Sequence, residues 1–139
     1  MSKMRPVGVV GLGRMGEPLA IRLGKMRSDI YIWDVNPDIR NKVSKNKNLF
    51  IAEPIKMSQK CSVVFFVVPS SKEIKLIFNG KQGILSNARE GLVVFDLTTS
   101  DPTQTKKIAE KASEKSISYL DAAMSGGPSG IQEGKLTLM

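Results

Sequence analysis

A glycine-rich loop at residues 11–16 constrains the fold of this chain more than any other feature. The loop reads GLGRMG and follows directly on the apolar run 7–10, which marks a turn from a strand into a helix. In such a turn Gly11 permits the tight bend, Gly13 lets the backbone approach a pyrophosphate, and Gly16 lets the helix pack closely on the strand. The free N–H groups and the positive dipole end of the helix favour an anion. The loop therefore predicts a site for a dinucleotide.

The sequence around the loop decides how much weight this pattern carries, because three glycines at this spacing also occur by chance. After the loop, Leu19, Leu23 and Met26 stand at i, i+4 and i+7, which predicts one apolar face of a helix. A second apolar run at 30–33 follows that helix. A strand, a glycine loop, a helix and a second strand make the unit in which this loop binds phosphate.

An acidic residue, Asp34, stands directly after the second apolar run, 18 residues beyond Gly16. This is the expected place of a carboxylate that binds the adenosine ribose. Two unit charges at about 4 Å and an effective dielectric of about 20 repel by roughly 4 kcal/mol, so Asp34 would oppose the 2′-phosphate of NADP. We therefore expect NAD, with NADP as the weaker alternative. Arg14 and Arg40 are basic residues nearby that act against this preference, and a solvated loop residue remains an alternative interpretation of Arg14.

Apolar runs and helical patterns alternate along the remaining chain, which predicts an α/β fold, a Rossmann-type doubly wound parallel sheet. Ligands of such sheets bind at the carboxyl ends of the strands, where the polar and glycine-rich segments of this chain fall. Asp101, Pro102 and Gln104 predict a capped helix start with a capping box. The expected strands cover 7–10, 30–33, 63–68, 92–95, 117–120 and 136–139, and the expected helices 15–26, 37–45, 55–60, 72–78 and 102–115.

Composition narrows the classes of partner. The net charge is +8, but the basic residues are spread along the chain without interleaved aromatic residues, so we expect no nucleic acid as a partner. No apolar run is long enough to span a bilayer and no signal peptide is recognisable, which favours a cytoplasmic protein without a membrane partner. Cys61 is the single cysteine and precedes an apolar run, which predicts a buried side chain. Without histidine, histidine acid–base catalysis and histidine metal sites are excluded, and no metal site is predicted.

Four ordered motifs carry a resemblance to a known family. The segment GLGRMGEPLA at 11–20 resembles the cofactor loop of the β-hydroxyacid dehydrogenases, which include 3-hydroxyisobutyrate dehydrogenase and tartronate semialdehyde reductase. The segments FFVVPSSKEIKLIFNGKQGIL at 65–85 and VVFDLTTSDP at 93–102 are similar to later segments of that family. DAAMSGGPSGIQEGKLTLM at 121–139 resembles its substrate-binding loop. Together the motifs are spread along the chain from residue 11 to residue 139.

The resemblance implies an oxidoreductase that transfers hydride between a nicotinamide cofactor and a small β-hydroxyacid. It places the substrate carboxylate on a loop whose backbone N–H groups and hydroxyl can bind it without a cation. The substrate-binding residues that it implies are Ser125, Gly126 and Gly127. The cofactor-binding residues expected from the loop, the acid and the resemblance are Gly11, Leu12, Gly13, Arg14, Met15, Gly16, Asp34, Val68, Pro69, Thr98 and Thr99.

The chain also departs from the family pattern. No lysine of the chain matches the family's catalytic lysine motif, which the resemblance places beyond Met139, so no catalytic residue is expected within 1–139. We interpret these residues as an NAD(P)-binding domain that stops before a helical C-terminal domain. A loop with Arg14 also occurs in 6-phosphogluconate dehydrogenases, but the segment 96–100 favours the hydroxyacid branch.

Two alternatives to a hydroxyacid dehydrogenase remain open. One is a non-catalytic NAD-binding module or pseudoenzyme. The other is a relative of NADPH-dependent semialdehyde or imine reductases. A homo-oligomer is compatible with a full-length form.

Overall fold

A six-stranded parallel sheet runs through the part of the chain that the computed structural model describes, which is residues 5–98, 101–122, 124–125, 128, 130 and 137–138. Its strand order, β3-β2-β1-β4-β5-β6, is that of two mononucleotide-binding halves joined between β1 and β4. The Rossmann-type fold predicted from the sequence is therefore confirmed. The strands are β1 (Val7–Val10), β2 (Ile30–Trp33), β3 (Leu49–Ile51), β4 (Val63–Phe66), β5 (Val93–Asp96) and β6 (Ser118–Asp121).

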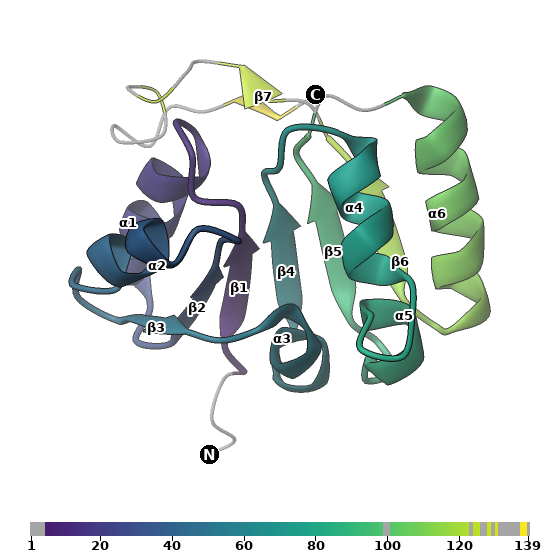
Figure 1. Cartoon of the computed structure of the whole chain (residues 1–139), viewed down its shortest axis with the longest axis horizontal. Helices are drawn as coiled ribbons and strands as arrows, with labels where there is room; N and C mark the ends of the chain where they lie inside the picture. The colour runs from purple at the N-terminus through teal and green to yellow at the C-terminus, as the bar shows by residue number, and fades with distance from the viewer. Residues whose placement is uncertain are drawn as a thin grey trace.

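The register brings the carboxyl ends of the central strands to one edge of the sheet. Val10, the last residue of β1, pairs with Trp33 on β2 and with Phe66 on β4. Figure 1 shows the arrowheads of β1, β4 and β5 pointing to the same edge, beyond which β7 (Met124–Ser125) lies. The loop after β1 and the loop after β4 therefore begin side by side, at the point where the chain order of the sheet reverses.

Helices cover the sheet from two sides and give it two separate cores. On one side α1 and α2 pack over β1, β2 and β3 through Leu19, Ala20 and Val43. On the other side α3, α4, α5 and α6 enclose a second core with Phe66 and Phe78 in contact. The helices are α1 (Gly16–Met26), α2 (Pro37–Val43), α3 (Pro54–Lys60), α4 (Ser71–Phe78), α5 (Ile84–Asn87) and α6 (Pro102–Glu114).

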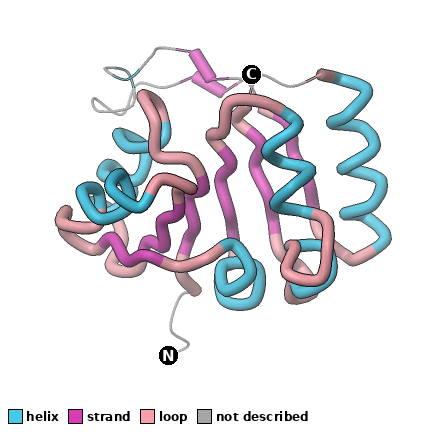
Figure 2. Tube along the Cα trace, in the orientation of Figure 1, coloured by secondary structure: helices cyan, strands magenta, loops and turns pink. Residues whose placement is uncertain are grey.

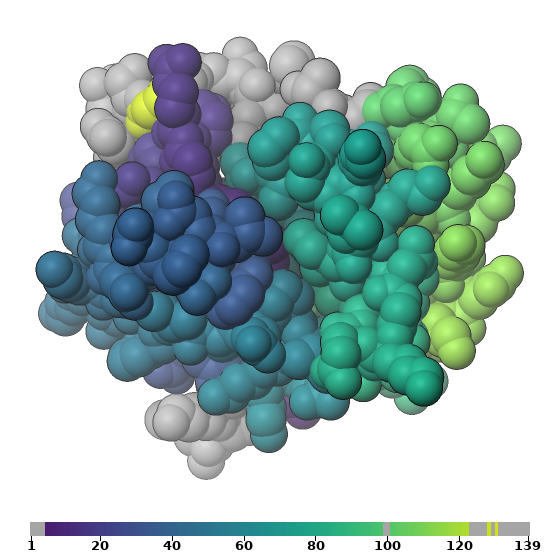
Figure 3. All heavy atoms as spheres, in the orientation of Figure 1, coloured from purple at the N-terminus to yellow at the C-terminus, as the bar shows by residue number. Residues whose placement is uncertain are grey.

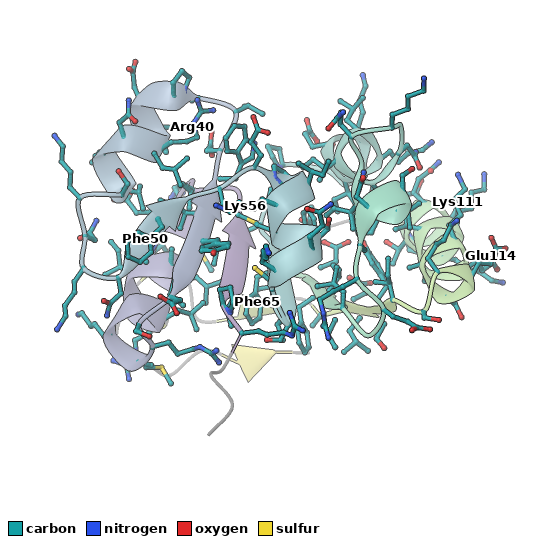
Figure 4. The ribbon with its side chains drawn as sticks, turned by 90° about the horizontal axis from the view of Figure 1, so that it is seen from below. Arg40, Phe50, Lys56, Phe65, Lys111 and Glu114 are labelled. Atoms are coloured by element: carbon teal, nitrogen blue, oxygen red, sulfur yellow. The ribbon has the colours of Figure 1, made fainter. Side chains whose placement is uncertain are left out.

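Two expected elements are shorter in the structure than the sequence patterns predicted. The strand expected at 63–68 ends at Phe66, and the helix expected to reach residue 45 ends at Val43. Three short elements, β3, α5 and β7, were not predicted. At the edge of the sheet, β3 is only three residues long and exposes Phe50, so neither length nor burial marks it in the sequence (Figure 4).

The last strand expected from the sequence, 136–139, is confirmed in the part that the structure describes. Its described part is a two-residue strand, β8 (Thr137–Leu138), and the two residues that would have extended it, Leu136 and Met139, lie outside the described residues. This strand pairs antiparallel with β7, apart from the six-stranded sheet. The sequence predicted a strand here without assigning it to a sheet, and the structure places it in a separate two-stranded sheet. Apolar residues mark a strand, but they do not indicate which sheet it joins.

Two local predictions were wrong for physical reasons. Met26 does not continue the apolar face of α1, since it is the last residue of the helix and 69% exposed. At the start of α6, Asp101 caps the helix by accepting from the backbone N–H of Thr103, as expected. Gln104 does not complete a capping box, because the backbone N–H of Asp101 donates instead to Oγ of Ser71 on α4. A contact between two helices has replaced the local one.

Candidate functional site: a pocket at the strand ends

The turn out of β1 depends on a glycine backbone. Gly11 has a φ of +98°, in the left-handed region that favours glycine. A Cβ there would lie 2.1 Å from the carbonyl oxygen of Val67, which belongs to the loop after β4. The N–H of Gly11 donates to the carbonyl of Trp33 at 2.8 Å, so the turn is fixed by the ends of both neighbouring strands.

The other two glycines of the loop have opposite surroundings. A Cβ on Gly16 would lie 1.7 Å from the carbonyl oxygen of Gly11, so that α1 can start this close to the turn only with glycine. A Cβ on Gly13 would meet no atom within 4 Å. Gly13 is therefore not required by the packing of the protein itself. Its missing side chain leaves open space, which is what close approach of a phosphate to the backbone needs.

Asp34, the residue after β2, is held by the loop that it faces. Its Oδ2 accepts from the backbone N–H of Leu12 at 2.9 Å, and its Oδ1 accepts from the N–H of Asn36 at 2.9 Å. A carboxylate has about four acceptor positions, so each oxygen can accept one further bond. The half-buried carboxylate thus has both a fixed orientation and the capacity to bind a pair of ribose hydroxyls.

These elements surround a pocket of about 390 Å³. Its volume lies within the range of small-molecule sites, and its wall is mostly apolar with a few polar groups. Figure 3 shows the surface hollowed between the purple-to-blue segment, which carries the glycine loop and the end of β2, and the teal segment, which carries α4. The lining residues are Val10, Gly11, Gly13, Arg14, Met15, Trp33, Asp34, Val35, Val67, Val68, Pro69, Glu73 and Ile77.

The two arginines that bear on cofactor preference have different surroundings. The guanidinium of Arg40, on α2 in Figure 4, lies 4.1 Å from the centroid of the Trp33 ring. It also donates to the backbone carbonyl of Asp34 at 2.8 Å, and it is not among the described lining residues. Arg14 is exposed and lines the pocket. Of the two, only Arg14 stands where it could meet a phosphate directly.

The loop after β4 is supported by a buried network of hydrogen bonds rather than by glycines. Asp96, the last residue of β5, is fully buried. It accepts from the hydroxyl of Tyr119 and, at 2.9 Å, from the N–H of Thr98. Burial and the bond to Asp96 raise the pKa of Tyr119 above its ordinary value. The Thr98 Oγ1 in turn accepts from the N–H of Val68 at 3.2 Å, so the network supports the loop that forms one pocket wall.

The structure brings together some of the predicted site residues and not others. Gly11, Gly13, Arg14, Met15, Asp34, Val68 and Pro69 line this pocket. Leu12 and Gly16 are buried and are not among its described lining residues. Thr98 is 4% exposed and accepts a hydrogen bond from the N–H of Val68. Ser125 belongs to β7, a strand that Figure 2 shows beyond the loops at the strand ends.

The remaining site predictions fall where the structure gives no description. Thr99, Gly126 and Gly127 lie outside the described residues, so their roles stay predictions. The same holds for the catalytic lysine, which the resemblance places beyond Met139, the last residue of the sequence. That no catalytic residue lies within 1–139 therefore also stays a prediction.

Sequence reasoning missed part of the pocket wall and the network behind it. Val35 is 85% exposed and Ile77 half-buried, so no apolar pattern identifies them as site residues. Glu73 had a signal, because Ser70 followed three residues later by glutamate is a capping-box pattern. Within the described ranges no cluster of three metal-binding side chains is found, and no helix has the length and apolarity to cross a membrane.

Comparison with known proteins assigns the family. A family model described as the NAD binding domain of 6-phosphogluconate dehydrogenase matches residues 6–139. The chain belongs to this family. It is 30% identical over 139 residues to the mitochondrial 3-hydroxyisobutyrate dehydrogenase of Mus musculus, covering 100% of this chain and 42% of that protein. It is 33% identical over 139 residues to 2-(hydroxymethyl)glutarate dehydrogenase of Eubacterium barkeri, covering 100% of this chain and 46% of that protein. This NAD(P)-binding domain thus spans less than half the length of these relatives.

Solved structures agree on the fold. The domain superposes on a Mycobacterium tuberculosis 3-hydroxyisobutyrate dehydrogenase with L-serine, with a TM-score of 0.84 at 22% identity over 99% of this chain and 46% of that one. Psf3 in complex with NADP+ and 2-OPP gives 0.88 at 22% identity, over 95% and 47%. An imine reductase variant from Myxococcus stipitatus in complex with NAD+ gives 0.80 at 18% identity, over 92% and 43%. Psf3 is in complex with NADP+ and the imine reductase variant with NAD+, so the fold alone does not choose between the two cofactors.

Proposed function

We propose that this chain binds NAD in preference to NADP, as the cofactor-binding part of an oxidoreductase that acts on a small β-hydroxyacid. The observation that carries the proposal is the pocket itself, in which an open Gly13 cradle and the Asp34 carboxylate face one cavity at the switch point of the sheet. When bound, the nicotinamide supplies a hydride acceptor or donor. The residues of this chain bind and orient it.

The residues fit the parts of a dinucleotide one by one. The open space at Gly13 and the start of α1 at Gly16 accommodate the pyrophosphate, with Arg14 as the lining cation. Asp34 accepts from the adenosine ribose, and the wall formed by Val68 and Pro69 continues the crevice toward the end of β5. For Thr98 we propose a supporting role, since its hydroxyl is bonded to Val68. The roles of Leu12, Met15, Thr99, Ser125, Gly126 and Gly127 are proposed on the resemblance.

The preference for NAD rests on the charge next to the ribose. A 2′-phosphate on that ribose would face the Asp34 carboxylate, and Arg40 is held over Trp33 and bonded to the Asp34 carbonyl instead of lining the pocket. At about 4 Å and an effective dielectric of about 20 the repulsion is roughly 4 kcal/mol, and a quarter of it already gives several-fold discrimination.

Replacing the acid tests this assignment. Calorimetric titration of the wild-type chain should give tighter binding of NADH than of NADPH. In Asp34→Asn the ratio of the two affinities should fall by about tenfold, because the variant removes the charge and keeps the side chain's size. Asp38→Asn, which removes a charge from the exposed first turn of α2, is the matched control and should keep the wild-type ratio. An unchanged ratio in Asp34→Asn contradicts the assignment.

The substrate class follows from the two relatives by name. 3-Hydroxyisobutyrate and 2-(hydroxymethyl)glutarate both carry a hydroxymethyl group on the carbon next to a carboxylate, and we propose a substrate with this unit. We also propose that the chain, 1–139, is one NAD-binding domain that binds without efficient turnover. Among its described residues the pocket is lined by no lysine, and the chain has no histidine. Lack of a general acid costs about 10²–10⁴-fold in rate.

An oxidation assay tests this second part. With NAD and either 3-hydroxyisobutyrate or 2-(hydroxymethyl)glutarate, the chain alone should show binding of the cofactor and little NADH formation. Robust turnover would show that the proton-transfer group lies within 1–139, and would overturn the assignment of no catalytic residue to this chain. If the chain binds NADH and neither acid changes the NADH affinity or leads to any NADH formation, the result would favour a non-catalytic NAD-binding module.

A further inference from the structure

The first turns of α4 form the wall of the pocket opposite the end of β2. Glu73 and Ile77, one helical turn apart, both line the cavity, while Asp34 and Val35 line it from the loop after β2. If the ribose is bound at Asp34, as proposed above, the base attached to it lies between these two walls. The apolar side chains of Val35 and Ile77 can pack on the two faces of a flat ring. The carboxylate of Glu73 is then left to contact the edge of that ring.

Glu73 is held in this wall and is not free to turn away. The hydroxyl of Ser70 donates to Oε2 of Glu73, and the same hydroxyl oxygen accepts from the N–H of Lys72 at 3.3 Å. This bond, together with backbone hydrogen bonds, lowers the pKa of the Glu73 carboxyl below its ordinary value, so the group is ionised at neutral pH. A carboxylate has about four acceptor positions. The Ser70 hydroxyl and the backbone N–H groups of Ser70 and Glu73 use up to three of them, which leaves capacity for one further donor from a ligand.

The base of a bound dinucleotide needs such an acceptor. The amino group on C6 of adenine is a donor, and a donor placed in an apolar pocket without a partner loses free energy. The acidic side chains among the described lining residues are Asp34 and Glu73, and Asp34 already binds Leu12, Asn36 and, in the proposed complex, the ribose. A 6-oxopurine would place a carbonyl oxygen against the Glu73 carboxylate, where both atoms are acceptors.

We propose that Glu73 accepts a hydrogen bond from the 6-amino group of the adenine ring and so selects a 6-aminopurine dinucleotide over a 6-oxopurine dinucleotide. The inference rests on the proposed function and adds to it the residue that recognises the base. A role limited to capping α4 would affect the stability of the helix without distinguishing one base from the other.

The test compares NADH with its hypoxanthine analogue, in which an oxo group replaces the 6-amino group and N1 carries a proton. The wild-type chain should bind NADH about tenfold or more tightly than the analogue, the discrimination expected of a directional hydrogen bond to a base edge. In Glu73→Ala the ratio should approach one. In Glu73→Gln, whose amide can donate to the oxo group as well as accept from the amine, the analogue should bind more tightly than it does to the wild type.

Two controls on the same helix turn keep the result specific. Lys72→Ala alters an exposed side chain that does not line the pocket and should keep the wild-type ratio. Ser70→Ala removes the anchor of Glu73 and should give an intermediate ratio. A wild-type chain that binds both dinucleotides equally, or a Glu73→Ala variant that keeps the wild-type ratio, overturns the inference. Binding of neither dinucleotide overturns the proposed function, and with it this inference.

Discussion

The half of the crevice next to β1 and β2 and the half next to β4 and β5 are held in shape by different means. In the first half the geometry comes from missing side chains, since Gly11 and Gly16 each bring a backbone carbonyl to a position that a Cβ would occupy. In the second half it comes from side chains, since the buried carboxylate of Asp96 binds Tyr119 and Thr98 and so fixes the loop at Val68. At Gly11 and Gly16 the protein has no room for an added Cβ, whereas a hydrogen-bond network can lose one member and keep its outline.

The largest effect is therefore expected within the glycine loop. Gly16→Ala places a Cβ 1.7 Å from the carbonyl oxygen of Gly11, and neither group can move without shifting α1 or the end of β1. We expect the free energy of unfolding to fall by about 4 kcal/mol or more, measured by urea denaturation. A variant as stable as the wild type would show that the loop is not tightly packed.

Gly13→Ala is the matched control for that substitution. The new methyl group meets no protein atom within 4 Å, and the φ of Gly13 is not in the left-handed region, so stability should change by less than about 0.5 kcal/mol. The affinity for NADH and for ADP should nevertheless both fall, by about tenfold, since the methyl group occupies space proposed for the pyrophosphate. If Gly13→Ala binds both ligands as the wild type does, the phosphate lies elsewhere.

A smaller effect is expected in the network of the second half. Tyr119→Phe removes the hydroxyl that donates to Asp96 and should lower the free energy of unfolding by about 1.5–3 kcal/mol, the range for a hydrogen bond to a charged group. Because Asp96 supports the β4 loop rather than the glycine loop, the affinity for NADH should fall while that for ADP stays within about twofold of the wild type. An equal loss of affinity for NADH and for ADP would show that the two halves of the crevice are coupled.

Tyr119 also makes the stability of the chain depend on pH in the alkaline range. The pKa of Tyr119 is raised on folding by burial and by its bond to Asp96, so folding favours the protonated phenol. Its contribution to stability is complete below the ordinary tyrosine pKa of about 10 and is lost as the pH rises above it. Urea unfolding between about pH 8 and pH 11 should show this decline in the wild type and a weaker decline in Tyr119→Phe. Parallel profiles would contradict the assignment.

The smallest effect is expected at the link between the network and the pocket wall. Thr98→Val removes the acceptor of the Val68 N–H and should cost about 1 kcal/mol of stability, with a modest loss of NADH affinity. Thr98→Ser keeps the hydroxyl and should retain both properties. If the valine variant binds NADH as tightly as the wild type, the loop at Val68 does not depend on this bond.

The two halves also differ in how far they could be predicted from the sequence. The glycine loop and Asp34 were identified because their chemistry is local, since each glycine is required by its own backbone or by a ligand at a fixed spacing. The bond of Asp96 with Tyr119 joins residues of two strands that are 23 positions apart, and no spacing rule indicates it. Gln104 illustrates the same limit, because the local capping box gave way to a contact between α4 and α6. Glu73 was missed because its capping pattern does not reveal which cavity it lines.

If NADH binds with its adenosine half in the pocket beside β2, as proposed, the chain contains a direct reporter of that binding. Trp33 is the only tryptophan, and it lines that pocket. Titration of the wild-type chain with NADH should quench Trp33 fluorescence in a saturable manner, with NADPH requiring a higher concentration for the same effect. Unchanged Trp33 emission up to millimolar NADH, or tighter binding of NADPH, would contradict the account.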